Sequence, residues 1–174
     1  QVKETLEAAS LPPIRPVAFG SGDYRTELGN ETVLFRHEEK FRNPCAIGFI
    51  VDDNASDDQI RKKTQAISAL EFERVGQKLS ATAVAVRQTG GAARFAEAVK
   101  LAAANTKLAL VLMSTDAAAI IKVLPAVKER RPLVYGITAS NAKELIPVVK
   151  EACVPAAVRC DGLESAAALT QECA

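Results

Sequence analysis

Polar side chains follow each of five short apolar runs of this 174-residue sequence. In chain order they are Asp52, Asp53, Arg87, Gln88, Ser114, Thr115, Thr138, Asn141, Arg159 and Asp161. If the runs are parallel strands, their carboxyl ends meet on the face where α/β proteins bind ligands. This mixed ring is suited to hydrogen bonding with an amide-rich cofactor or with a loop of a partner protein. The candidate cofactor-binding residues are its last four members, Thr138, Asn141, Arg159 and Asp161.

The same residue types have a second use, because Ser, Thr, Asn and Asp at strand ends also cap the following helices. For Asp116 and Asn141, capping is favoured over contact with a ligand. Arg87 and Arg159 are not capping residues, but each could pair with a neighbouring carboxylate on the same rim. The ring therefore admits both a structural and a binding interpretation.

No catalytic residue and no metal site is predicted. His37 is the only histidine, and a structural hydrogen bond is favoured for it over metal binding. The cysteines, Cys45, Cys153, Cys160 and Cys173, form neither the CxxC pairs of structural zinc nor the tight groups of an iron–sulfur cluster. No Ser/His/Asp or Cys/His triad can be assembled from the sequence.

Composition excludes several classes of function. The 22 basic and 21 acidic residues are spread along the chain and give a formal net charge of +1, so no nucleic-acid partner is predicted. No apolar run approaches the roughly 20 residues that span a bilayer, and charges and prolines interrupt the N-terminus before a signal peptide could form. We therefore predict no membrane association and a cytoplasmic location.

The apolar runs alternate with amphipathic stretches, which is typical of βα units on a parallel sheet. The predicted strands are 46–51, 83–86, 108–113, 133–137 and 156–158. After the first, strand starts recur at about 25 residues, which leaves room for one helix and two short loops per unit. The predicted helix N-caps are Ser56 or Asp57, Asp116, Ser140 or Asn141, and Asp161.

Even spacing favours a (β/α) barrel over a nucleotide-binding sheet, since the turn after the first strand, residues 52–55, has no glycine. Five units are three fewer than a barrel needs. The predicted fold is therefore α/β, a partial TIM barrel of about five βα units at residues 31–174. Residues 1–30 are predicted to form an extended N-terminal arm, and residues 31–41 an edge strand or hairpin.

An incomplete barrel has two open edges. We expect these to be the strands at 46–51 and 156–158. Apolar side chains such as Ile47, Phe49 and Val158 should then be partly exposed on the concave face. The predicted consequence is a chain that needs further cover from its own subunit, a second copy or a partner.

Four stretches of the sequence are distinctive. They are Thr32-Val33-Leu34-Phe35-Arg36-His37-Glu38, Phe72-Glu73-Arg74-Val75-Gly76-Gln77-Lys78-Leu79, Arg131-Pro132-Leu133-Val134-Tyr135 and Val158-Arg159-Cys160-Asp161-Gly162-Leu163. In order and spacing they resemble the large (gamma) subunit of the corrinoid iron–sulfur protein of the acetyl-CoA synthase/decarbonylase system of anaerobes. The resemblance runs from about Pro16 to the C-terminus and corresponds to that subunit's central TIM barrel.

The resemblance implies a role in one-carbon metabolism, in the reductive acetyl-CoA (Wood–Ljungdahl) pathway. A full subunit of that family has a four-iron cluster domain, the barrel and a cobalamin-binding domain, and its partners are a small subunit, a methyltransferase and acetyl-CoA synthase. This chain lacks the cluster cysteines and the corrinoid domain, so neither the 4Fe-4S cluster nor cobalamin is expected in this segment.

The leading hypothesis is a barrel scaffold that supports methyl transfer and is not catalytic alone. The alternative is a free-standing barrel enzyme, such as a pterin-dependent methyltransferase, which should have all eight units. A third possibility is a purely structural fragment that proteolysis of the full subunit has left. It differs from the leading hypothesis only in how the chain arose.

Overall fold

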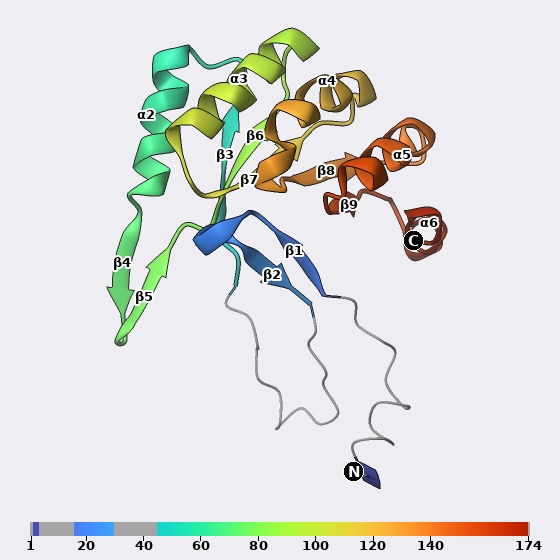
Figure 1. Cartoon of the computed structure of the whole chain (residues 1–174), viewed down its shortest axis with the longest axis horizontal. Helices are drawn as coiled ribbons and strands as arrows, with labels where there is room; N and C mark the ends of the chain where they lie inside the picture. The colour runs from blue at the N-terminus through green and yellow to red at the C-terminus, as the bar shows by residue number, and fades with distance from the viewer. Residues whose placement is uncertain (1, 4–15, 30–44, 174) are drawn as a thin grey trace.

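The computed structural model describes residues 2–3, 16–29 and 45–173. The edge strand or hairpin predicted at 31–41, with His37, lies outside the described residues. Figure 1 shows a row of helices packed along a sheet, with a short antiparallel pair of strands below it. Within the described ranges, none of the helices is both long and apolar enough to cross a bilayer.

Five parallel strands form the main sheet. Its order is β3-β6-β7-β8-β9, so each strand pairs with the one before it in the sheet. The strands are β3 (Gly48–Asp52), β6 (Ala83–Arg87), β7 (Ala109–Met113), β8 (Leu133–Ile137) and β9 (Ala156–Val158). The five predicted strands and their parallel pairing are confirmed. Closure into a barrel stays a prediction.

Five helices follow these strands and bury one face of the sheet. They are α2 (Asp57–Ser68), α3 (Ala92–Asn105), α4 (Ala117–Val127), α5 (Ala142–Ala152) and α6 (Leu163–Cys173). The apolar stripes of the amphipathic helices are buried in the main core, and Phe95 of α3 and Ile120 of α4 are among its fully buried side chains. Strand residues such as Val84 and Leu110 meet the helices from the other side.

Three predicted N-cap positions are confirmed, Ser56, Asp116 and Asn141, and the first two cap their helices through the side chain. The Ser56 side chain accepts from the backbone N–H of Gln59, whose own side chain accepts from the backbone of Ser56, which is a capping box. Asp116 accepts from the backbone N–H groups of Ala118 and Ala119 at the start of α4. Helix α6 begins only at Leu163, so Asp161 stands outside it.

The predicted extended arm is wrong for its described part. Residues 16–29 contain strands β1 (Val17–Phe19) and β2 (Thr26–Leu28), which pair antiparallel across the short 3-10 turn η1 (Gly22–Tyr24). Gly20 has a φ of +83°, and a Cβ there would lie 2.9 Å from the Ala109 Cβ and collide with the Tyr24 carbonyl. Gly20 and Gly22 thus form the turn of this segment, and the missing side chain of Gly20 lets it approach the sheet closely.

Phe19 fixes this hairpin to the sheet. It packs with Ala83 and Ala109 in a small second core, on the opposite face from the helices. The backbone N–H of Gly20 also donates to the carbonyl of Arg131, at 2.8 Å. The hairpin therefore covers part of the sheet face that the helices leave open.

A second hairpin was not predicted. Strands β4 (Glu71–Arg74) and β5 (Gln77–Ser80) pair antiparallel in the connection between α2 and β6. Figure 1 shows this hairpin projecting away from the helices and the main sheet.

The two expected edges are confirmed, since β3 and β9 are the outer strands of the five. Phe49 is 39% exposed, Ile47 is similarly exposed and Val158 is half-buried, as expected. The expected face is wrong for Phe49 and Val158. Phe49 stands beside Val84, which is buried under the helices, so Phe49 lies on the helix-covered face at its uncovered edge. Val158 pairs with Ile137 and packs against the same helix-covered core.

Candidate functional site

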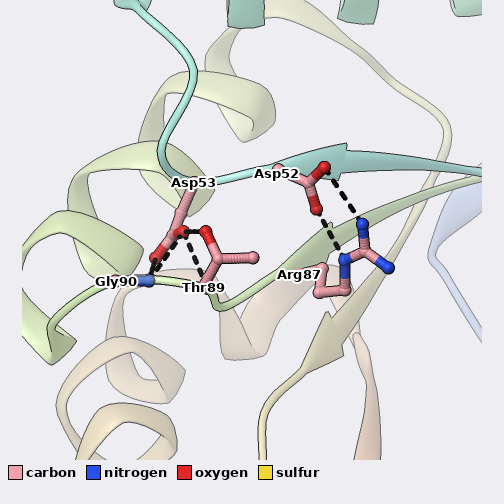
Figure 2. A network of polar contacts seen from close by, with 5 residues as sticks. All are labelled: Asp52, Asp53, Arg87, Thr89 and Gly90. Atoms are coloured by element: carbon pink, nitrogen blue, oxygen red, sulfur yellow. Dashed lines mark hydrogen bonds and ion pairs between the residues drawn. The ribbon is translucent and has the colours of Figure 1, made fainter.

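The strand-end ring begins with an ion pair between the last residues of two neighbouring strands. Asp52 of β3 and Arg87 of β6 are in register, and Arg87 donates from Nε to Oδ1 at 2.6 Å and from Nη2 to Oδ2 at 3.1 Å. Figure 2 shows the two side chains facing each other across the strands. The hydrogen bond from Arg87 lowers the pKa of the Asp52 carboxyl, despite partial desolvation. The pairing suggested for Arg87 is confirmed.

The next residue, Asp53, has a different environment. It has no exposed surface, and its Oδ1 accepts from the Thr89 backbone N–H at 2.8 Å and from the Thr89 hydroxyl at 2.6 Å. The Gly90 N–H donates to both carboxylate oxygens, at 3.1 and 3.2 Å. These bonds, drawn in Figure 2, hold the loop between β6 and α3 against the end of β3. Asp53 is thus a buried anion satisfied by the protein itself.

Arg94 joins α3 to the loop that leads into α2. Its guanidinium donates to the carbonyls of Asp53 at 2.8 Å and Ala55 at 2.6 Å, and to the Asp57 carboxylate at 2.8 Å. The hydrogen bond to Asp57 is the largest cause that raises the pKa of Arg94. The first two strand-end loops are therefore linked to each other from both sides.

The middle of the ring is linked through Gln88. Its side-chain oxygen accepts from the Ser114 hydroxyl, and its amide nitrogen donates to the Gly90 carbonyl at 3.0 Å and to Asp116 at 3.4 Å. The Ser114 hydroxyl in turn accepts from the Asp116 backbone N–H at 2.9 Å. Since Asp116 also caps α4, these polar groups are occupied by the scaffold.

Asn141 is likewise committed to internal contacts. Its Oδ1 accepts from the Thr138 N–H at 2.8 Å, and its Nδ2 donates to the carbonyls of Thr115 at 2.8 Å and Gly136 at 3.1 Å. Asn141 is buried at the N-cap position of α5, but its side chain does not bond to the helix. The Thr138 hydroxyl lies 2.9 Å from that of Ser140. Two of the four cofactor-binding candidates thus fasten the loop after β8.

The other two candidates, Arg159 and Asp161, remain exposed. The Arg159 backbone N–H donates to Ile137 at 2.7 Å, which extends the β8–β9 pairing. Among the residues that the structure describes, neither side chain has a hydrogen-bond or ion-pair partner. A guanidinium and a carboxylate at the end of β9 are thus available to an external group.

The cysteines do not fit an iron–sulfur cluster. Within the described ranges, no three Cys, His, Asp or Glu side chains converge on a point where a metal ion could be held. Cys45 and Cys153 are exposed, whereas Cys160 and Cys173 are half-buried against the core. Burial raises the pKa of the Cys173 thiol, which disfavours the thiolate that a metal would need.

Sequence reasoning placed Asp53 in the ring but missed its partners, Thr89 and Gly90, and missed Arg94. A signal was available. Thr89 and the glycines after it follow a predicted strand, and such a turn exposes backbone N–H groups that a neighbouring carboxylate can accept.

Comparisons with known proteins address the whole chain. A family profile described as the CO dehydrogenase/acetyl-CoA synthase delta subunit matches residues 16–174. The corrinoid/iron-sulfur protein large subunit of Moorella thermoacetica is 40% identical over 98% of this chain and 38% of its own length. The acetyl-CoA decarbonylase/synthase complex subunit gamma of Methanopyrus kandleri is 33% identical over 97% of this chain and 37% of its own length.

The corresponding gamma subunit of Methanocaldococcus jannaschii is 30% identical over 86% of this chain and 30% of its own length. The chain thus spans well under half the length of these relatives. The matched region begins at residue 16, as the resemblance predicted. The chain therefore belongs to the CO dehydrogenase/acetyl-CoA synthase delta subunit family, within which it resembles corrinoid iron–sulfur protein large subunits and the corresponding gamma subunits.

Proposed function

We propose that residues 31–174 are the barrel scaffold of a corrinoid methyl-carrier subunit. In the full subunit, cobalamin and a 4Fe-4S cluster reside in other domains, and the scaffold supports methyl transfer between a methyltransferase, the cobalt centre and acetyl-CoA synthase. The partners are these two enzymes and a small subunit, and the location is the cytoplasm. The 40% identity to a corrinoid/iron-sulfur protein large subunit along nearly the whole chain carries this proposal.

The strand-end ring supports a scaffold role for a physical reason. A face that must receive a cofactor domain repeatedly needs loops that keep their shape, because any loop ordering on contact would cost binding free energy. Asp53, Gln88 and Asn141 bind the loops to one another through hydrogen bonds that require no ligand. The rigid part of the face is therefore preorganised.

Arg159 and Asp161 provide the contact chemistry in this proposal. A guanidinium donates to amide carbonyls and carboxylates, and a carboxylate accepts from amide N–H groups, so the two together match a rim of amides. Thr138 and Asn141 act as positioning residues, because their internal hydrogen bonds hold the neighbouring loop. The chemistry of the cobalt belongs to the cofactor and not to these side chains.

The test is Arg159→Ala in the full subunit, with the rate of methyl transfer and the melting temperature both measured. Loss of one charge-assisted hydrogen bond, about 1.5–3 kcal/mol, should slow transfer by about tenfold or more. The melting temperature should hardly change, because the side chain is exposed. Asn141→Ala should instead lower the melting temperature, since it leaves the Thr138 N–H without its acceptor.

A matched control is Lys122→Ala, which removes an exposed cation from helix α4, away from the strand ends. It should leave both the rate and the melting temperature unchanged. A normal transfer rate in the Arg159→Ala subunit would remove Arg159 from the proposal. A fall in melting temperature without a fall in rate would assign it to packing.

A further inference from the structure

The parallel register of the main sheet sets one row of side chains across all of its strand ends. The members of this row are partners on neighbouring strands: Asp52, Arg87, Met113, Tyr135 and Ala157. Figure 2 shows the first two, joined by their ion pair. The residue before each of the first four is buried in the core under the helices, so the row lies on the opposite face of the sheet. That face is the concave side of the predicted barrel, and the row stands at the strand ends where such barrels bind ligands.

The other end of this face is covered by the protein itself. Phe19 of hairpin β1–β2 packs against Ala83 and Ala109, the first residues of β6 and β7. Leu133, the first residue of β8, packs against the same small core. Tyr135, two residues further along β8, is 37% exposed. On β8, the concave face therefore becomes open at the level of Tyr135.

A β-bulge in β8 decides which side chain stands beyond Tyr135. Tyr135 pairs with Ala157 and Ile137 pairs with Val158, so β8 advances by two residues where β9 advances by one. Regular alternation would have set Ile137 on the same face as Tyr135. The bulge instead turns Ile137 towards the helices, where it is 1% exposed in the main core. An apolar side chain is thereby removed from the space beyond Tyr135.

The sequence around the bulge is fitted to hold it. Gly136, the extra residue, has a φ of +119°, and a Cβ there would lie 2.5 Å from the Ser114 carbonyl oxygen. The Asn141 side chain donates to the Gly136 carbonyl at 3.1 Å and to the Thr115 carbonyl at 2.8 Å. Gly136 and Asn141 thus fix the bulge from the backbone and from the following helix.

The same bulge selects the neighbour of Arg159. The Arg159 N–H donates to the Ile137 carbonyl at 2.7 Å, which continues the β8–β9 pairing beyond Val158. Level with Arg159, β8 therefore presents Thr138 in place of Ile137. Because side chains alternate along a strand, Arg159 lies on the face that carries Tyr135. Three side chains with polar ends are thus gathered where β8 and β9 end.

Tyr135 has chemistry that the scaffold does not use. Its hydroxyl has no hydrogen-bond partner among the residues that the structure describes. A phenol hydroxyl both donates and accepts, which matches the NH2 and the carbonyl of a primary amide. Met113 and Ala157, its neighbours in the row, supply apolar surface beside that hydroxyl. The rim of cobalamin carries primary amides on short methylene chains, which can use both kinds of contact.

We propose that Tyr135 is a further contact residue of the strand-end face, and that its hydroxyl forms a hydrogen bond with an amide side chain of cobalamin beside Arg159. The occupant is the cobalamin of the same full subunit, and Gly136 and Asn141 act as positioning residues. The inference rests on the proposed function, which brings the cofactor to this face, and it adds the residue that makes contact.

The bulge favours this occupant over packing by further strands of the subunit's own barrel. A barrel interior that the chain fills by itself is packed with bulky branched side chains. Ile137 is such a side chain, and regular alternation would have supplied it to the concave face at no cost. Its removal, together with the replacement of its position beside Arg159 by Thr138, suits a polar group that enters from the strand ends.

The experiment places a fluorinated tyrosine at position 135 of the full subunit and records its fluorine NMR signal without cobalamin and with stoichiometric hydroxocobalamin. In the corrinoid-free subunit, we expect the signal to differ between H2O and D2O, because the ring is exposed. On addition of hydroxocobalamin, the signal should move and lose that difference. This measurement requires no methyl transfer.

Tyr24 provides the matched control. It is also an exposed tyrosine, but it belongs to the turn η1 at the opposite end of the strands. A fluorinated tyrosine at position 24 should give the same signal with and without hydroxocobalamin.

Two substitutions measure the strength of the contact. Tyr135→Phe should weaken the binding of hydroxocobalamin to the corrinoid-free full subunit about two- to tenfold, as loss of one neutral hydrogen bond does. Tyr24→Phe should leave this affinity unchanged. Each variant removes one exposed hydroxyl and keeps the ring, so both should fold normally.

Three outcomes would overturn the inference. A signal at position 135 that does not respond to hydroxocobalamin would exclude the contact. A signal that is already insensitive to D2O in the corrinoid-free subunit would show that the subunit's own chain packs on Tyr135. An unchanged affinity in Tyr135→Phe would show that the hydroxyl forms no such bond. Slower methyl transfer in the Arg159→Ala subunit would still support the proposed function in each case, so the two proposals fail separately.

Discussion

Replacing Asp53 by alanine should destabilise the protein far more than the same change at its neighbour. The Asp53 carboxylate is fully buried and accepts four hydrogen bonds, two of them at Gly90, from three donor groups of the β6–α3 loop. Alanine removes the acceptor and leaves the backbone N–H groups of Thr89 and Gly90 facing a small cavity. The Thr89 hydroxyl can rotate to another acceptor, but the two N–H groups cannot.

The magnitude follows from these two groups. A buried donor left unsatisfied costs about 1–3 kcal/mol, so two together give about 2–6 kcal/mol, with about 4 kcal/mol as the central expectation. A water that enters the cavity would recover part of this. Native proteins are stable by about 5–15 kcal/mol, so the loss is a large fraction of the whole.

Asp52→Ala is the matched control, because Asp52 is the preceding residue and also binds a neighbouring strand end. Its ion pair with Arg87 is solvent-exposed, and such pairs contribute little to stability. Asp53→Asn should fall between the two alanine variants. Its carbonyl oxygen can still accept from Thr89, but its amide group would face the Gly90 N–H, donor against donor.

The assay is urea unfolding of the purified variants followed by circular dichroism, with hydrogen exchange at Thr89 and Gly90 as the local measurement. We expect Asp52→Ala to be the most stable variant, Asp53→Asn to be intermediate and Asp53→Ala to be the least stable. Hydrogen exchange at the Thr89 and Gly90 amides should be faster only in the Asp53 variants. Equal stability of the two alanine variants, with both amides still protected, would refute the role assigned to the buried carboxylate.

Four further predictions concern other sites. Arg87→Ala should raise the pKa of Asp52 towards its ordinary value in an NMR titration, because the guanidinium hydrogen bond lowers it. Because the pKa of Asp52 is lower in the folded state than in the unfolded state, the small stability that this pair adds is fully present above the unfolded-state pKa. It is lost as pH falls through the folded-state pKa, and the stability of the Arg87→Ala variant should not show this decrease. Val75→Asn should stabilise the protein by about 1 kcal/mol in urea by relieving the strain at positive φ, and no gain would contradict that strain. Gly20→Ala should destabilise the protein by about 1–3 kcal/mol, and an unchanged melting temperature would show that hairpin β1–β2 can shift to admit a Cβ. The purified chain should have no visible absorption band, and a stoichiometric cobalamin or iron–sulfur band would reveal a cofactor site outside this account.

The main sheet could be predicted because its strands are buried on their helix-facing side and read as apolar runs. The prediction at 133–137 agrees with β8, and the prediction at 83–86 lacks only Arg87 of β6. Hairpin β4–β5 was not predicted because its strands are exposed and charged and therefore contain no apolar run in the sequence. Hairpin β1–β2 was not predicted because its strands are only three residues long, which is too short to show a periodic pattern in the sequence.

The ring of polar strand ends was also predictable, since any parallel sheet gathers such residues on one face. It was not predictable which of these side chains form hydrogen bonds within the protein and which remain free. Arg87 and Arg159 look alike in sequence, yet the parallel register sets Arg87 beside Asp52, whereas Arg159 forms no ion pair with any carboxylate of the described residues. That difference depends on which residues stand opposite in the register, and a single sequence does not contain it.

The sequential order of the main sheet bears on how the chain folds during synthesis. Each of β6, β7, β8 and β9 pairs with the sheet strand synthesised before it, so a newly made strand finds its partner already present. A unit of about 25 residues takes about 1–5 s to translate, whereas helices and short loops form in microseconds or less. β3 therefore acts as the template for the sheet. The first crossover is the slowest to complete, since it holds both α2 and the β4–β5 hairpin, and the ribosome must pass this hairpin before the sheet can gain its second strand.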